Sequence, residues 1–404
     1  MTVPEEDLPV TLPPVDEYKP TEQGDPPLSR ADDEWMMVTL PDGRVGTRET
    51  NTMPQWAGSC WYYLRYLDPD YSDGPVSIEA EKYWMPVDLY VGGAEHAVLH
   101  LLYARFWHKV LYDCGVVSTK EPFQRLFNQG TILKESYIDT NGKYYLPEQV
   151  EQSDGRWTVI ESGMSVETQM EKMSKSKLNV VNPDDVIAKY GADSVRLYEL
   201  FIGPVSASTP WQTSGVEGVY RFLQRTWRLV VDENTGELSA KVKDVPGEDE
   251  PELWRLLHKT VKSVGGDSDE IDKMNTAISH LMIYVNTATQ ARTIPRVCID
   301  TFLRLLAPYA PHIAEELWLR LGKTGLIAQA PWPSYDEALC VDESISMPVQ
   351  VNGKVRAQIE VQADADEETV KVAALAHEKI VPYISEKTVK RVIVVPGRLI
   401  NVVV

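Results

Sequence analysis

Lys172-Met173-Ser174-Lys175-Ser176, followed at once by Lys177, is the stretch that indicates most about the fold and chemistry of this chain. Three ammonium groups and two hydroxyls fall within six residues of a sequence whose formal net charge is −20. Lysine ammoniums act as mobile point charges for phosphate oxygens, and serine hydroxyls donate hydrogen bonds to the same atoms. The run therefore predicts a site that holds a polyanion; the alternative is a solvated basic turn or a nuclear-localisation-like patch.

The residues after this run predict that its lysines lie on a loop leading into a helix. Asn182 suits the N-cap and Pro183 the first helical position. Around the loop, from about residue 51 to 205, helical and strand patterns alternate. Such alternation favours a parallel sheet, whose ligands gather at the carboxyl ends of its strands.

Hydrophobic spacing predicts the elements of this region. We expect helices over 61–67 and 94–114, a strand over 89–91, and another strand with its turn over 125–129 and 132–133. Residues 137–160 predict a β-hairpin insertion that turns at Asn141-Gly142.

The flanking regions differ in character. Residues 1–50 are rich in proline and acids, and predict either a disordered leader or an extended strap. Residues 206–340 predict an antiparallel helical bundle, with helices over 215–231, 250–264, 267–289 and 299–321, the last bent near Pro308 and Pro311. Residues 345–404 predict a small α+β domain, with a hairpin at Asn352-Gly353, a helix over 369–383 and strands over 389–395 and 399–404. The predicted fold class is therefore multidomain α/β.

Composition sets broader bounds. An apolar content of 43% and a charged content of 25% are typical of a globular protein, and no apolar run is long enough to span a bilayer. The four cysteines are far apart and form no C-x-x-C pair, which argues against a zinc site and a disulfide framework and predicts a cytoplasmic location. Because the net charge is −20, any contact with RNA phosphates must come from local basic patches.

A second informative block is Gly92-Gly93-Ala94-Glu95-His96, with His100 four residues after His96. Glycines after a strand let the backbone approach a ligand closely, and the following helix N-terminus favours an anion or a hydroxyl-rich group. Glu95 has the chemistry to accept both hydroxyls of a ribose, and the two histidines would share one helix face. The alternative is one helix-capping and one core histidine; a zinc site fits less well, because no third ligand is evident.

A third block, from Asn51 to Tyr66, is dense in aromatic side chains and includes Trp56 and Tyr62. Core packing must account for most of them. A crowded aromatic wall would also line a pocket for a branched aliphatic side chain.

Together these blocks resemble bacterial-type leucyl-tRNA synthetases, which are class I aminoacyl-tRNA synthetases with a KMSKS signature. The similarity runs over nearly the whole chain and keeps the family's order. Its segments are the aromatic block at 51–66, GGAEHAVLH at 92–100, RLFNQG at 125–130, KMSKS at 172–176, YGADSVRL at 190–197, SGVEG at 214–218 with RFL at 221–223, LAPYAPHIAEELW at 306–318, VNGKVR at 351–356 and VPGR at 395–398.

The sequence also departs from the family. The HIGH motif of the first catalytic half has no counterpart here, and neither has the threonine-rich editing domain. The resemblance therefore implies a C-terminal part of such an enzyme, whether a fragment, a truncated gene model or one subunit of a split enzyme. Residues 1–50 would then be a strap returning from the editing insertion, and 51–205 the second half of a Rossmann-like catalytic domain. Residues 206–340 would be the anticodon-binding domain, and 345–404 a domain that contacts tRNA.

By this resemblance, the enzyme joins L-leucine to ATP, with Mg²⁺ as the counter-ion of ATP, and passes leucine to tRNA(Leu). Lys172 and Lys175 would be the catalytic groups at the β and γ phosphates. ATP would also be bound by Ser174, Ser176, Gly93 and Glu95, and leucine by Trp56, Tyr62, His96 and His100. The N-terminal half of the synthetase would be a partner chain if the enzyme is split.

Two basic clusters are expected to bind tRNA, on residues Arg221, Arg225, Arg228, Lys387, Lys390, Arg391 and Arg398. For the C-terminal cluster, the alternative is a sheet edge protected by solvated lysines. Two other functions stay open: a valyl, isoleucyl or methionyl synthetase fragment, and a non-catalytic tRNA-binding module. GGAEHAVLH and the hairpin sequence NGKVRA favour the leucyl type.

Overall fold

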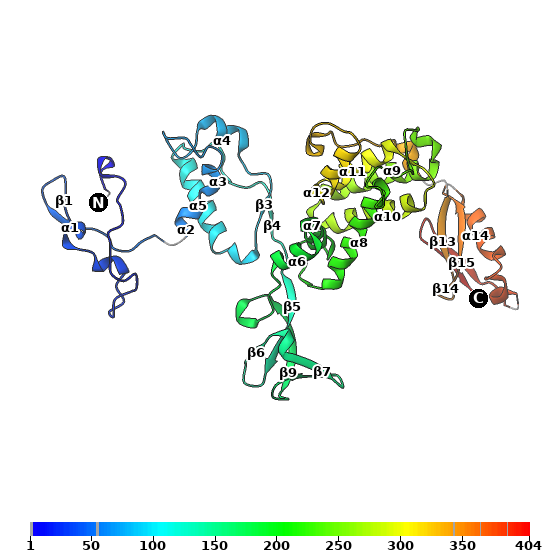
Figure 1. Ribbon diagram of the computed structural model, residues 1–404, viewed down its shortest axis with the longest axis horizontal. Helices are drawn as coiled ribbons and strands as arrows, with labels where there is room; N and C mark the ends of the chain where they lie inside the picture. The colour runs from blue at the N-terminus through cyan, green and yellow to red at the C-terminus, as the bar shows by residue number, and fades with distance from the viewer. Residues whose placement is uncertain (1–2, 54–55, 342–343, 364, 386) are drawn as a thin grey trace. The chain divides into compact units, whose positions relative to one another are not determined.

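The computed structural model describes residues 3–53, 56–341, 344–363, 365–385 and 387–404 (Figure 1). Contacts between residues divide the chain into two compact units, Met1–Gln129 and Gly130–Val404.

In the first unit, the segment before residue 50 contains short elements rather than one continuous strand. They are η1 (Glu5–Asp7), η2 (Pro27–Arg30), α1 (Asp33–Met36) and an antiparallel pair of β1 (Met37–Thr39) and β2 (Val45–Thr47). The Trp35 indole nitrogen donates a hydrogen bond to the Thr11 carbonyl at 3.0 Å, and the Arg48 Nε donates to the Trp35 carbonyl at 2.9 Å. Side chains thus tie the extended residues to the hairpin, and the role of this segment as a strap stays a prediction.

The remainder of the first unit alternates helices with a parallel strand pair. Its elements are α2 (Trp56–Ser59), α3 (Tyr62–Arg65), α4 (Ile78–Trp84), β3 (Tyr90–Val91), η3 (Ala94–His96), α5 (His100–Asp113) and β4 (Leu126–Phe127). The expected helix over 94–114 is wrong at its start. A 3-10 turn follows Gly93, and the backbone of Leu99 (φ −114°, ψ −106°) is not helical, so α5 begins at His100.

The second unit begins with a six-stranded sheet, visible as the green strands in Figure 1. Its strands are β5 (Ile132–Asp139), β6 (Tyr144–Tyr145), β7 (Val150–Ser153), β8 (Arg156–Val159), β9 (Ser165–Lys172) and β10 (Thr209–Pro210). The order is β10-β5-β9-β8-β7, with β6 also paired to β5, and only the β5–β10 pair is parallel. The parallel pairing expected for residues 51–205 is found in β3–β4 and β5–β10, whereas the pairs among β5 to β9 are antiparallel, and the Asn141-Gly142 turn joins β5 to β6. The expected hairpin at this turn is confirmed.

Gly130 is required where β5 meets the segment leading to β10. Its N–H donates a hydrogen bond to the Val205 carbonyl at 2.8 Å. A Cβ at this position would lie 2.1 Å from the carbonyl oxygen of Ala207, a backbone atom. Only glycine therefore allows the two backbones to approach this closely.

Helices dominate the next part of the chain. They are α6 (Pro183–Tyr190), α7 (Ala192–Phe201), α8 (Thr213–Val230), α9 (Pro251–Ser268), α10 (Met274–Gln290), α11 (Arg296–Leu306), α12 (Pro311–Arg320) and α13 (Glu337–Cys340). The N-cap prediction is confirmed, since Asn182 Oδ1 accepts a hydrogen bond from the Asp184 N–H at 3.2 Å. The structure adds η6 (Gly247–Asp249), η7 (Ile271–Lys273), η8 (Ile327–Gln329) and a parallel pair of β11 (Val242–Lys243) and β12 (Ile294–Pro295).

Two helix boundaries in this region differ from expectation. The helix predicted over 267–289 starts at Met274, because α9 continues to Ser268 and a 3-10 turn separates the two. The predicted bent helix over 299–321 is two helices, α11 and α12, with Pro311 at the first position of the second. One apolar cluster joins α7 to α12, and includes the stacked rings of Tyr284 and Phe302 at 5.0 Å.

The C-terminal part is a four-stranded sheet with two helices. It contains β13 (Ser344–Val351), β14 (Lys354–Gln362), α14 (Glu367–Ala376), α15 (Val381–Ile384), β15 (Arg391–Val395) and β16 (Leu399–Val403), in the strand order β14-β13-β16-β15. The Asn352-Gly353 hairpin is confirmed, with φ of 49° and 80° at the two turn residues. The single helix expected over 369–383 is wrong, because His377 has an extended backbone (φ −67°, ψ 129°) that ends α14.

All four cysteines are free thiols. Among the described helices, none combines the length and hydropathy needed to cross a bilayer.

Candidate functional site

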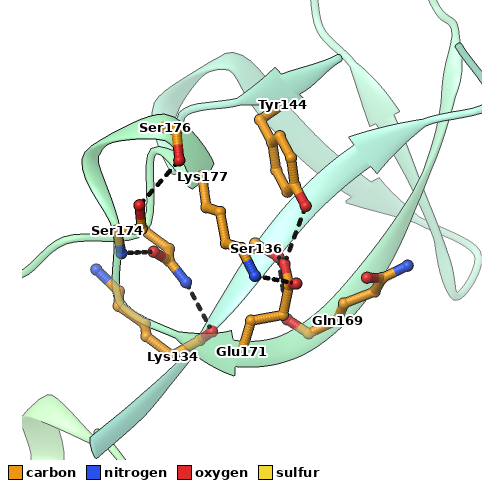
Figure 2. Close-up of polar contacts among 9 residues, drawn as sticks. Lys134, Ser136, Tyr144, Gln169, Glu171, Ser174, Ser176 and Lys177 are labelled. Atoms are coloured by element: carbon orange, nitrogen blue, oxygen red, sulfur yellow. Dashed lines mark hydrogen bonds and ion pairs between the residues drawn. The ribbon is translucent and has the colours of Figure 1, made fainter. Parts of the chain in front are cut away.

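The loop that carries the lysine-rich run connects β9 to α6. Lys172 is the last residue of β9, and Lys175–Lys177 form the 3-10 turn η5, after which Leu178 takes a left-handed conformation (φ 56°). Asn179, only 1% exposed, holds this turn. Its Oδ1 accepts a hydrogen bond from the Ser174 N–H at 2.9 Å, and its Nδ2 donates to the Lys134 carbonyl at 3.1 Å (Figure 2). The loop is thus fixed at its base to β5.

Lys177, the last lysine of the run, pairs with an acid of the preceding strand. Its ammonium forms an ion pair with Glu171, and Figure 2 shows Ser136 and Tyr144 converging on the same carboxylate. The Ser136 and Tyr144 hydroxyls donate to Glu171 Oε2 at 2.6 and 3.3 Å. The hydrogen bond from Lys177, followed by that from Ser136, lowers the pKa of Glu171, and the same contact with Glu171 raises the pKa of Lys177.

The remaining polar side chains of the run lie at the surface. Lys172, Lys175 and Ser176 are exposed, and the hydroxyls of Ser174 and Ser176 lie 2.9 Å apart in a mutual hydrogen bond. Lys175 forms no ion pair within the part of the chain that the structure describes. Exposed ammonium and hydroxyl groups on a turn with a fixed base can bind phosphate oxygens.

Four residues predicted to hold leucine come together in the first unit. The rings of Trp56 and His96 lie 5.7 Å apart in an edge-on contact, and those of Tyr62 and His100 lie 5.9 Å apart. The sequence analysis missed Tyr90, which links Tyr62 to His100. Its hydroxyl hydrogen-bonds to the Tyr62 hydroxyl at 2.8 Å and to His100 Nε2 at 2.6 Å. Its only sequence signal is its place at the end of a short apolar strand.

The environments of His100 and Tyr90 favour the neutral forms of these two side chains. Burial, together with a neighbouring His96, lowers the pKa of His100. Burial, then the hydrogen bond with Tyr62, raises the pKa of Tyr90. The Nδ1 atoms of His96 and His100 are buried without a hydrogen-bond partner among the described residues. The cluster therefore combines aromatic rings with a hydroxyl–imidazole hydrogen-bond network, and it holds two buried imidazole nitrogens whose hydrogen-bonding capacity is unused among the described residues.

The Glu95 side chain also lies in contact with the backbone of Gly93. A Cβ on Gly93 would lie 2.3 Å from Glu95 Oε2, so the carboxylate lies directly against the glycine α-carbon. Gly93 is extended (φ −62°, ψ 145°) and precedes the η3 turn that carries Glu95. A side chain at residue 93 would displace this carboxylate.

The three arginines of α8 do not form a uniform basic face. Arg221 is exposed, Arg225 donates to Asn286 Oδ1 at 2.6 Å, and Arg228 pairs with Glu233 at 2.9 Å. Arg221 is therefore the most available of the three for an external anion.

The C-terminal basic residues are all exposed, namely Lys387, Lys390, Arg391 and Arg398. Within the described residues, none of the four forms an ion pair with an acid. Arg391 begins β15, which is an edge strand of the four-stranded sheet. The position suits both phosphate binding and protection of a sheet edge.

The structure offers no built metal site in the residues it describes, where no group of three or more His, Cys, Asp or Glu side chains converges.

Two protein-family models match parts of this chain. Residues 149–211 match the model for tRNA synthetases class I (I, L, M and V), a segment that contains the lysine-rich loop. Residues 250–372 match the model for the anticodon-binding domain of tRNA ligase, which covers α9 to α13 and continues into the C-terminal sheet.

Relatives match along the whole chain. Leucine–tRNA ligase 1 of Rhizobium johnstonii is 54% identical over 405 residues, which is all of this chain and 47% of that protein. The LeuRS of Agrobacterium radiobacter K84, solved as a ternary complex with tRNA and LeuAMS, is 32% identical with a TM-score of 0.67, covering 100% of this chain and 49% of that one. The chain thus spans about half the length of the relatives it matches.

These matches show that the chain has the class I tRNA synthetase fold, with a Rossmann-like portion and an anticodon-binding domain. Within that class, it is homologous along its entire length to leucine–tRNA ligase, which confirms the resemblance seen in the sequence.

Proposed function

We propose that this chain acts as the C-terminal part, or as a subunit, of a leucine–tRNA ligase. The reaction joins L-leucine and ATP into leucyl-adenylate and diphosphate, then transfers leucine to tRNA(Leu) with release of AMP. The observation that carries the proposal is the pair of exposed lysines Lys172, at the end of β9, and Lys175, on the following turn, within a chain that is 54% identical over its whole length to a leucine–tRNA ligase. Its free cysteines are consistent with a cytoplasmic enzyme.

The chemistry of the loop would be electrostatic. Attack of the leucine carboxylate on the α-phosphorus requires alignment, and negative charge builds on the departing diphosphate. Lys175 and Lys172, with Ser174 and Ser176, would bind the β and γ phosphate oxygens and stabilise that charge. Mg²⁺ would enter as the counter-ion of ATP, and since the described residues form no metal cluster we assign it no ligand from this chain.

The first unit would supply substrate recognition. Trp56, Tyr62, His96 and His100 would surround the leucine side chain and its polar groups, with Tyr90 aligning Tyr62 and His100. Glu95, placed against Gly93, would accept the ribose hydroxyls of ATP, as a carboxylate accepts from two donors at once. Both roles await a test of substrate binding.

The amino acid that the enzyme activates distinguishes a leucyl enzyme from a valyl, isoleucyl or methionyl one. The chain, supplied with the N-terminal portion of the Rhizobium relative that it does not match, is expected to exchange ATP and pyrophosphate with leucine far more efficiently than with valine, isoleucine or methionine. Valine lacks one methylene of leucine, a difference that a hydrophobic pocket discriminates by about 10- to 200-fold, whereas isoleucine and methionine would be rejected by the shape of their side chains. Preference for one of the other three amino acids would contradict the leucyl assignment, and tRNA binding without any exchange would favour a non-catalytic module.

We further propose that residues 206–340 bind the anticodon region and residues 345–404 contact the rest of tRNA(Leu). With a net charge of −20, affinity must come from local clusters, and the stretch from Lys387 to Val404 contains no acid. The triple variant Lys387→Gln, Lys390→Gln, Arg391→Gln is expected to weaken tRNA binding by the reconstituted enzyme while leaving leucine activation nearly intact.

Filter binding across a salt series measures this effect. Each lost phosphate contact should flatten the slope of log affinity against log salt by about 0.7–0.9. Deletion of residues 345–404 should reduce affinity at least as much. If slope and affinity are unchanged in both variants, the C-terminal cluster protects a sheet edge and the bundle binds tRNA alone.

A further inference from the structure

Glu171 is the acid that pairs with Lys177 of the KMSKS-K run. Glu171 is the residue of β9 before Lys172, and its side chain is 18% exposed. It pairs in register with Lys134 of β5, so it lies inside the sheet rather than on the loop. From there its carboxylate receives groups from three other elements (Figure 2).

Those contacts engage both oxygens of the carboxylate. Oε1 is paired with the Lys177 ammonium of η5. Oε2 accepts from Ser136 of β5 at 2.6 Å and from Tyr144 of β6 at 3.3 Å. A mostly buried carboxylate with one cation and two hydroxyl donors holds its partners in a single arrangement, and loss of its charge would leave the ammonium uncompensated.

The position of Lys177 affects the substrate-facing lysine. Lys175 and Lys177 belong to the same 3-10 turn and are separated only by Ser176. Holding the Lys177 ammonium on the sheet therefore fixes the turn from one end, while Asn179 fixes the backbone at Ser174. Lys175, which has no acidic partner among the described residues, is left pointing to solvent from a turn held at two points.

We propose that Glu171 is a positioning residue for leucine activation: by pairing with Lys177 it ties the KMSKS loop to β5 and β6 and keeps Lys177 away from the phosphates. This inference rests on the proposed function of the loop. Lys177 then acts through Glu171 rather than through substrate.

Glu171→Gln tests the ion pair with little other change, because glutamine keeps the shape and an oxygen acceptor for Ser136. In the reconstituted enzyme we expect leucine-dependent exchange to fall about 10- to 100-fold, the scale for misplacing a catalytic group by about 1 Å. The ATP KM should rise while the leucine KM is unchanged. Glu167→Gln is the matched control, since Glu167 is exposed on the same strand. Equal rates for the two variants would overturn the proposal.

The double variant Glu171→Gln, Lys177→Gln distinguishes positioning from direct contact. If Lys177 works only through Glu171, the double variant should lose no more activity than the more severe single variant. Multiplication of the two single losses would mean that Lys177 contacts substrate independently, and would contradict the proposal.

A second readout needs no activity and uses the 404-residue polypeptide itself. Trypsin cleaves after lysine, and pairing with Glu171 should protect the Lys177–Leu178 bond relative to the Lys175–Ser176 bond. Glu171→Gln is expected to raise the ratio of cleavage after Lys177 to cleavage after Lys175 several-fold, with no change in Glu167→Gln. An unchanged ratio would overturn the positioning role, whereas a raised ratio without exchange in the unmodified enzyme would contradict the proposed function alone.

Discussion

Replacing Lys175 with alanine is expected to lower the rate of leucine activation about 10²–10³-fold in the reconstituted enzyme, the scale for losing one preorganised donor to transition-state charge. Lys175 stands exposed on a turn that Asn179 and Glu171 hold in place. A turn held in this way would keep the Lys175 ammonium within reach of the diphosphate as charge develops there. The measurement is the initial rate of leucine-dependent ATP–pyrophosphate exchange.

The kinetic pattern makes this result specific. The leucine KM should change little, because the lysine would contact diphosphate rather than the amino acid. Lys143→Ala is the matched control, since Lys143 is an exposed lysine in the β5–β6 turn of the same sheet. A rate in Lys175→Ala equal to that of the control would remove Lys175 from the mechanism.

Local signals in the sequence predicted much of the fold. The N-cap at Asn182 and the hairpin at Asn352-Gly353 depend on residues adjacent in sequence, so their side-chain and backbone preferences suffice. The same holds for the long helices, whose apolar spacing marks the face that packs into the core. Domain boundaries were drawn from composition, and they stay predictions.

Helix ends and sheet direction were predicted less well. The backbone of Leu99 leaves the helical region although the apolar pattern continues through it, and α5 therefore starts later than the pattern suggests. Likewise, the hairpin predicted at Asn141-Gly142 is local, but the antiparallel pairing of β5 with β9 joins strands that are far apart in sequence, and the alternation of helices and strands does not reveal it.

Within the candidate site, contacts between residues that are distant in sequence were likewise not predicted. Similarity identified the residue types of the loop and the pocket, but the pairing of Lys177 with Glu171 depends on how a strand end meets a 3-10 turn. Tyr90 bridges Tyr62 and His100, which lie 28 and 10 residues from it in sequence. Arg225 donates a hydrogen bond to the side-chain amide of Asn286, 61 residues away. The sequence placed Arg225 on an exposed basic helix face, and only the fold reveals this partner.

The 404-residue polypeptide by itself is expected not to activate leucine. The 404-residue chain contains the KMSKS loop but no HIGH motif, and it spans 47% of its Rhizobium relative. Half of the expected ATP site is therefore outside this sequence. Under the proposed function, the α-phosphate and the adenine would then lack the partners that align them with leucine, and alignment can supply about 7–11 kcal/mol of an enzyme's barrier reduction.

Leucine-dependent ATP–pyrophosphate exchange by the purified 404-residue polypeptide, measured with and without the unmatched N-terminal portion of that relative, tests the central claim most directly. We predict no exchange above background for the polypeptide alone, and leucine-dependent exchange when the two parts are combined. Exchange by the polypeptide alone at a rate near that of an intact synthetase would contradict the account, as would a correctly folded combination of the two parts that binds tRNA but never activates leucine.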